Sequence, residues 1–95
     1  MAKRLEWSKR AQADRLKITE FYAQEASPYV AMEARQTILK AALAAAENPL
    51  QYREGKKQGT REYVMRRFPY TLIYRVTASK VTIVRVLHQA MRYFN

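Results

Sequence analysis

The sequence predicts an α+β fold with the element order β-α-α-β-β-β, in which a short N-terminal strand and a two-helix hairpin pack on a C-terminal antiparallel sheet. Two helix-type segments fill the first half of the chain, and three short segments rich in β-branched and aromatic residues fill the second half. The connections between those three segments are much shorter than the dozen or so residues of a parallel crossover, so the strands pair antiparallel. At 95 residues the chain is expected to form a single domain, residues 1–95.

The first two elements follow from alternation and capping. In residues 3–7, Leu5 and Trp7 fall on one side, which predicts an edge strand. Ser8 is a candidate N-cap for a helix from Lys9 to Gln24. The apolar residues of that helix fall close to one face, and they are Ala11, Ile18, Phe21 and Tyr22.

A second helix is predicted from about Pro28 to Glu47. Ser27 serves as its N-cap, and proline suits the first helical position because its missing N–H needs no partner there. The run AALAAAE consists mostly of strong helix formers, and Asn48-Pro49 ends the helix. The predicted buried stripe of this helix is made of Ala31, Ala34, Ile38, Ala42 and Ala45.

The segment from Leu50 to Thr60 holds both glycines and shows no periodicity, which predicts a basic, mobile loop. Strands are then expected at residues 61–67, 70–77 and 80–87, separated by Phe68-Pro69 and by a tight turn at Ala78-Ser79. Alternation places Arg85 on one face of the last strand with Val81, Ile83 and Leu87. Both faces of that strand are largely apolar, so it is either a central strand covered on both sides or one whose second face meets a partner.

The positive charge is concentrated in the second half of the chain. Residues 1–48 hold 8 Lys/Arg and 6 Asp/Glu, a net of +2, whereas residues 49–95 hold 10 and 2, a net of +8. Such a surface indicates a negatively charged partner, either nucleic acid or an acidic protein. We expect no membrane association, because no apolar run is long enough to span a bilayer and no signal peptide is evident, and we expect a cytoplasmic protein.

The composition argues against several classes of site. The absence of cysteine excludes disulfides and thiolate metal sites, and one histidine with eight scattered acids makes a metal centre unexpected. No phosphate-binding loop, dinucleotide fingerprint or serine-nucleophile motif is present, so no cofactor is expected.

The candidate functional residues lie in the last third of the chain. Arginines beside tyrosines on a sheet suit contact with phosphate or with an acidic target, and the candidates for target contact are Arg61, Arg66, Arg67, Arg85 and Arg92. A plainer interpretation is that these arginines are solvated or paired with Glu54 and Glu62. Metal-free cleavage of RNA would need a base, an acid and cations around one phosphate, and the candidates for that chemistry are Arg61, Arg85, His88 and Tyr93. Structural roles at the end of the sheet remain the alternative for His88, Tyr93 and Phe94.

The chain resembles the RelE/ParE superfamily of toxins from bacterial toxin–antitoxin modules, and its ParE-like branch in particular. The resemblance covers almost the whole length. It is carried by Trp7-Ser8 with Ala11, Asp14, Ile18 and Tyr22, by Pro49, by Gly59-x-Arg61-Glu62-Tyr63, by Phe68-Pro69-Tyr70, by the run 72–76 (LIYRV), and by Val84-x-Val86-Leu87-His88.

The resemblance implies a toxin that a cognate antitoxin, expected to be acidic, holds inactive in a hetero-oligomer. RelE-like members cut mRNA on the ribosome with lysines, arginines and a late tyrosine, whereas ParE-like members poison DNA gyrase and cut nothing themselves. This chain has Thr71 after Tyr70, where RelE-type nucleases tend to carry an arginine, and Tyr63-Val64-Met65 lacks their lysines. These departures favour gyrase as the target. The alternatives are a ribosome-dependent endoribonuclease and a non-toxic nucleic-acid-binding module.

Overall fold

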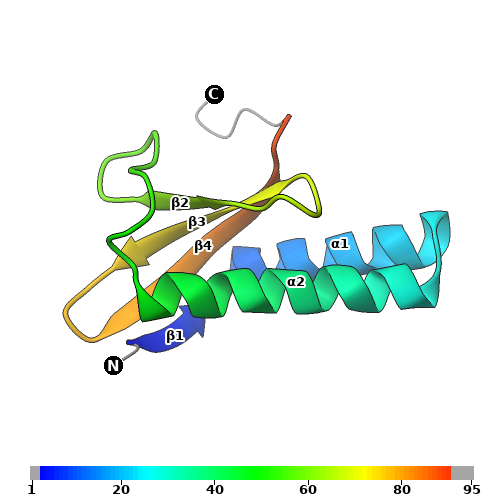
Figure 1. The fold of residues 1–95 in the computed structure, drawn as a ribbon, viewed down its shortest axis with the longest axis horizontal. Helices are drawn as coiled ribbons and strands as arrows, with labels where there is room; N and C mark the ends of the chain where they lie inside the picture. The colour runs from blue at the N-terminus through cyan, green and yellow to red at the C-terminus, as the bar shows by residue number, and fades with distance from the viewer. Residues whose placement is uncertain (1–2, 91–95) are drawn as a thin grey trace.

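The computed structural model describes residues 3–90. The elements of that part of the chain are β1 (Arg4–Trp7), α1 (Lys9–Glu25), α2 (Pro28–Glu47), β2 (Arg61–Val64), β3 (Tyr70–Val76) and β4 (Lys80–His88). This order and the α+β class are the ones that the sequence predicts. The two helices run side by side, and the sheet lies across them (Figure 1). No helix within residues 3–90 combines the length and the apolar character needed to cross a membrane.

Serine side chains cap both helices, as expected. The Oγ of Ser8 accepts a hydrogen bond from the Ala11 N–H at 3.0 Å, and the Oγ of Ser27 accepts one from the Val30 N–H at 3.1 Å. The predicted stripe of α2 is buried, and it extends to Ala41 and Ala46. These small side chains allow α2 to lie close to its neighbours.

The prediction for α1 is wrong at one position. Ala11 and Ile18 are buried, but the Phe21 side chain is 51% exposed. Successive helical residues differ by about 100° in direction, so Phe21 and Tyr22 cannot both point into the core. Tyr22 takes the inner position, with its ring centroid 5.1 Å from that of Phe68.

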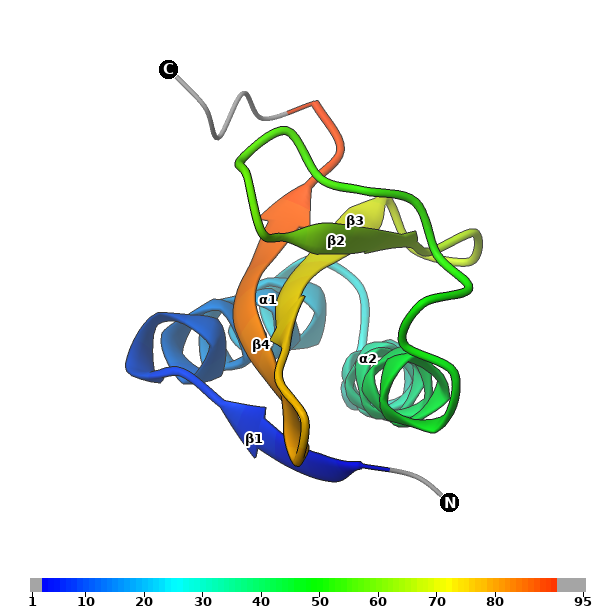
Figure 2. The same cartoon turned by 90° about the vertical axis from the view of Figure 1, so that its left-hand side faces the viewer.

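The strand order in the sheet is β1-β4-β3-β2. The three C-terminal strands pair antiparallel, as the short connections require. The predicted edge strand, β1, is confirmed at the edge, and it joins β4 in the parallel sense. β4 is therefore a central strand, with β1 on one side and β3 on the other (Figure 2).

A β-bulge overturns the predicted faces of β4. The register shifts between Ile73 and Tyr74, whose partners are Arg85 and Ile83, so Val84 has no partner in β3. Beyond this extra residue the alternation is inverted. Val86, rather than Leu87, therefore belongs to the core cluster, and Arg85 does not continue the face of Ile83.

β2 is shorter than predicted, because it ends at Val64 and not at residue 67. The Met65 N–H donates to the Tyr70 carbonyl at 3.0 Å, which closes a turn, and Met65 and Phe68 are buried. Arg66 and Arg67 therefore lie in this turn and not on a strand. The segment predicted as a loop, Leu50 to Thr60, also folds back on itself, since the Gly55 N–H donates to the Thr60 carbonyl at 2.7 Å.

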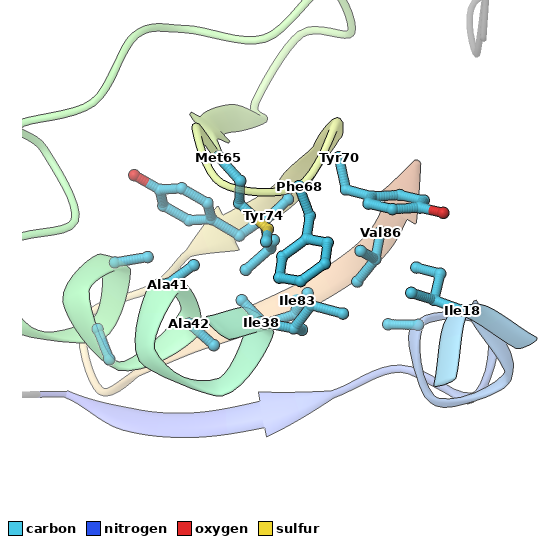
Figure 3. Packing of buried hydrophobic residues seen from close by; sticks show 14 of the residues in the cluster. Ile18, Ile38, Ala41, Ala42, Met65, Phe68, Tyr70, Tyr74, Ile83 and Val86 are labelled. Atoms are coloured by element: carbon cyan, nitrogen blue, oxygen red, sulfur yellow. The ribbon is translucent and has the colours of Figure 1, made fainter. Parts of the chain in front are cut away.

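The core lies between the helices and the sheet. Figure 3 shows Ile18 of α1 and Ile38 of α2 pointing toward Phe68, Ile83 and Val86. Tyr74 is fully buried, and its hydroxyl donates to the Pro49 carbonyl at 2.6 Å. This bond joins the middle of β3 to the end of α2, so the start of the following segment is held against the sheet.

Candidate functional site

Arg61 opens β2, but its guanidinium is directed at the preceding segment. Its Nη1 donates to the Tyr52 carbonyl at 2.7 Å and lies 3.5 Å from the Leu50 carbonyl. Backbone carbonyls are neutral, so the charge of this half-buried arginine is retained while its geometry is fixed by the fold. Arg61 therefore stabilises the 50–60 segment.

The turn between β2 and β3 holds the second pair of candidate arginines. The Nε and Nη2 of Arg67 each donate to a carboxylate oxygen of Glu33 at 3.0 Å, and its guanidinium lies 4.6 Å from the centre of the Phe68 ring. Arg66 is exposed and makes no hydrogen bond or ion pair with any residue that the structure describes. Of the two, Arg66 is the more open to a target.

Arg85 is held by Asp14 of α1 in a two-pronged ion pair. The Nε and Nη2 of Arg85 donate to the Oδ2 and Oδ1 of Asp14 at 2.8 and 3.1 Å, and the Val86 N–H donates to the same Oδ2 at 2.9 Å. The hydrogen bonds to Asp14 raise the pKa of the Arg85 guanidinium. We call Asp14, Arg85 and the Val86 N–H the α1–β4 clasp.

The clasp lies where β1 ends. Upstream of it, the Ser8 N–H and Oγ donate to the carbonyls of Ile83 and Val84 at 2.9 and 2.8 Å. β1 ends at Trp7, and beyond it the backbone groups along this edge of β4 form hydrogen bonds with Ser8 and Asp14 instead of with a strand. The bulge at Val84 turns Arg85 toward this helix.

His88 ends β4 and is exposed. Its Nδ1 accepts a hydrogen bond from the Ala90 N–H at 3.1 Å, and its ring lies edge-on to that of Tyr70 with the centroids 5.4 Å apart. Burial, with a further contribution from Tyr22, raises the pKa of the Tyr70 phenol to about 12. Tyr70 is therefore a neutral phenol throughout the physiological range.

Arg85 and His88 line one shallow cavity of about 390 Å³. Its other lining residues are Asp14, Lys17, Ile18, Phe21, Tyr70, Val86 and Leu87. Sequence reasoning missed Lys17 and Tyr70 as neighbours of these two candidates. Arg92 and Tyr93 lie outside the described residues.

Arg61 lies away from this cavity. It pairs with Tyr74, whereas His88 pairs with Tyr70, and four residues of a strand span about 13 Å. The structure thus brings Arg85 and His88 together, and it does not bring Arg61 to them. Within residues 3–90, no three His, Asp or Glu side chains gather closely enough to hold a metal ion.

The sheet face that points away from the core cluster carries few cations in its centre. Thr71 and Ile73 alternate with the core residues of β3, and they pair with Val64 and Glu62 of β2. Thr71, Ile73 and Glu62 are all buried. The position at which a RelE-type nuclease would be expected to hold phosphate is thus occupied by a buried threonine with no charge.

A family model, described as the ParE toxin of the type II toxin–antitoxin system parDE, matches residues 5–93. The chain belongs to this ParE toxin family. No curated protein matches the sequence. The family assignment therefore rests on the pattern of residues along almost the whole chain.

Solved structures share the fold of this ParE-family chain. The chromosomal ParDE toxin–antitoxin system from P. aeruginosa is similar with a TM-score of 0.83 and 24% identity, covering 92% of this chain and 96% of that one. The RelBE2 toxin–antitoxin complex from Mycobacterium tuberculosis follows with a TM-score of 0.64 and 22% identity, covering 96% and 95%. The DinJ–YafQ toxin–antitoxin complex from E. coli has a TM-score of 0.51 and 16% identity, covering 98% and 99%.

Proposed function

We propose that this chain is a toxin that stops growth in the cytoplasm by poisoning DNA gyrase, and that it cuts no nucleic acid itself. The membership of the ParE toxin family supports a toxin of this branch. The observation that carries the proposal is Thr71, which is 8% exposed between Val64 and Leu87 and offers no charge to a phosphate.

The positions of the arginines also favour binding of a protein target over cleavage of RNA. Metal-free cleavage of RNA needs its proton-transfer groups and cations within reach of one phosphate. Here the Arg85 guanidinium is neutralised by Asp14, and Arg61 is about 13 Å from the strand position of His88. Arg66 and Arg67, in the turn before Tyr70, are better placed to touch a protein surface, with Arg66 the more accessible.

A supercoiling assay tests the proposal. Adding the purified chain to gyrase and relaxed plasmid at equal concentration is expected to stop supercoiling and to trap cleaved DNA. The variant His88→Ala should inhibit as strongly as the wild type, since the proposed contact uses Arg66 and Arg67. Full supercoiling in the presence of the wild-type chain would contradict the proposal.

The alternative is a ribosome-dependent endoribonuclease, and one observation favours it. Arg85, His88, Lys17 and Tyr70 line a single cavity, which gathers cations and proton-transfer groups in one place. Under this alternative, induction would produce new cuts in mRNA at the ribosomal A site, visible by primer extension, and His88→Ala would abolish both the cuts and the growth arrest. Unchanged growth on expression of the wild-type chain would leave only a non-toxic binding module.

We also propose that a cognate antitoxin neutralises the chain in a hetero-oligomer. The similar solved structures are toxin–antitoxin systems and complexes. The net charge of +10 favours an acidic partner. Large apolar side chains that such a partner could cover are exposed on the two helices, among them Leu16, Met32 and Leu43.

Binding of the protein encoded next to this chain should weaken as salt rises, and calorimetry at several salt concentrations measures this. A salt-independent affinity would contradict an acidic partner.

A further inference from the structure

A small basic hairpin stands at the outer edge of β2, and neither the proposed gyrase contact nor the cavity uses it. It comprises residues 53–61, and we call it the basic hairpin. The Glu62 N–H donates to the Arg53 carbonyl at 2.9 Å, and the Gly55 N–H donates to the Thr60 carbonyl. Between these bonds, the backbones of Glu54 and Arg61 form an antiparallel β-bridge. These bonds extend the sheet beyond β2, so the hairpin has a defined shape.

The tip of the hairpin is closed by a tight turn. The N–H and Oγ1 of Thr60 donate to the Lys57 carbonyl at 3.1 and 2.6 Å, and Gly59 has a φ of 81°, which glycine adopts without strain. Arg75 of β3 lies against the turn, with its Nη1 3.5 Å from the Gln58 carbonyl. The exposed Arg75 guanidinium is thereby placed beside the lysines of the turn.

Positive charge dominates this corner of the molecule. The bases are Arg53, Lys56, Lys57, Arg61 and Arg75, and the acids are Glu54 and Glu62, a net of +3. Arg53 pairs with the buried carboxylate of Glu62 at 2.7 Å, and the side chains of Lys57 and Arg75 are exposed. Long exposed cations held on a fixed hairpin suit a ligand whose charges recur at short intervals.

The uncharged residues of the hairpin distinguish nucleic acid from protein as that ligand. Protein interfaces depend on apolar or aromatic anchors, and residues 55–59 (GKKQG) have none. The tyrosines nearby, Tyr52 and Tyr63, are half-buried and packed on each other with ring centroids 4.7 Å apart, so they offer no open face for base stacking. With apolar anchors and base stacking excluded, electrostatic contact with a phosphate backbone is the mode of binding that this hairpin supports.

We propose that the basic hairpin and Arg75 bind the phosphate backbone of double-stranded DNA without reading its sequence. The choice of duplex DNA rests on the proposed function, because gyrase holds DNA while it is being poisoned. The toxin then contacts the protein through one surface and the DNA through another. Contacts of this kind weaken steeply with salt, since each one releases bound counterions.

Fluorescence anisotropy with a labelled duplex of about 20 base pairs tests this surface, at several salt concentrations between roughly 0.05 and 0.2 M. The test variant is Lys57→Gln with Arg75→Gln. The matched control is Lys9→Gln with Lys40→Gln, which removes the same charge from exposed positions on α1 and α2. Circular dichroism and thermal unfolding are the checks that both variants remain folded.

Losing two phosphate contacts should lower the logarithmic salt slope by about 1.8 and weaken binding about 60-fold at 0.1 M salt, whereas the control should stay close to the wild type. Equal losses in both variants would show that only net charge matters and would overturn the proposal. So would the absence of duplex binding by the wild type, or equally tight binding of polyglutamate, which would indicate an acidic protein as the partner. The proposed function fails separately, because the supercoiling assay can show no inhibition while duplex binding persists.

Discussion

The α1–β4 clasp makes a quantitative prediction about stability. Replacing Asp14 with alanine removes three hydrogen bonds, two from Arg85 and one from the Val86 N–H. The side chains of Arg85 and Asp14 are 26% and 14% exposed, so water replaces these bonds only in part. A lost charge-assisted pair of this kind costs about 1–2 kcal/mol, and a half-buried N–H without a partner costs about the same.

Asp14→Ala is therefore expected to lower the free energy of unfolding by about 2–4 kcal/mol, or the melting temperature by roughly 10–30 °C for a domain of this size. Asp14→Asn keeps an oxygen for the Val86 N–H and should cost about half as much. Urea unfolding followed by circular dichroism measures both. Glu20→Ala, on the exposed side of the same helix, is the control and should change stability by no more than about 0.5 kcal/mol.

A loss of less than about 1 kcal/mol for Asp14→Ala, or one no larger than that of the control, would refute the stabilising role of the clasp. A double-mutant cycle with Arg85→Ala adds a second check. If the two side chains act as a pair, the double variant should lose clearly less than the sum of the single losses.

Two further predictions concern alkaline stability and the hairpin turn. Burial raises the pKa of Tyr70 and of Tyr74 to about 12, so stability is complete below the unfolded value of about 10 and falls as pH rises from there toward 12. Urea unfolding at pH 8 and 11 should show this loss, and Tyr70→Phe should reduce it; ionisation of every phenol near pH 10, seen by absorbance, would contradict it. Gly59→Ala should lower the free energy of unfolding by about 1–2 kcal/mol, because its φ of 81° strains any residue with a Cβ. Gly59→Asn should cost less, since asparagine tolerates this conformation, and equal losses would argue against backbone strain.

The fold could be predicted because its signals are local. Ser8 and Ser27 mark helix starts by themselves, the alanines of α2 mark its buried side, and the short gaps between β2, β3 and β4 allow only antiparallel pairing. Where the prediction was wrong, non-local packing decided the outcome. Burial of Met65 and Phe68 shortens β2, and the bulge at Val84 inverts the faces of β4 where α1 takes over its edge.

The candidate site could be predicted only as a list of residue types. Nothing in the spacing along the chain shows that Arg85 meets Asp14, 71 positions away, or that Arg67 meets Glu33, 34 positions away. Asp14 was part of the pattern by which the chain resembles its family, which was the one available signal of its importance. The partners of an arginine determine how much of its charge is available, and they become visible only in three dimensions.

The central position of β4 has a consequence for the synthesis of the protein. Among the strands of residues 3–90, β1 is made first and β4 last, and the two pair, so that Arg4 lies beside Lys80. Until Lys80–His88 have left the ribosome, β1 and β3 have no strand between them and α1 has no partner for Asp14. A chain with such distant pairings folds late, because its sheet is incomplete until β4 has been made. The part of the surface that depends on β4 therefore forms only after nearly all of residues 3–90 have been made.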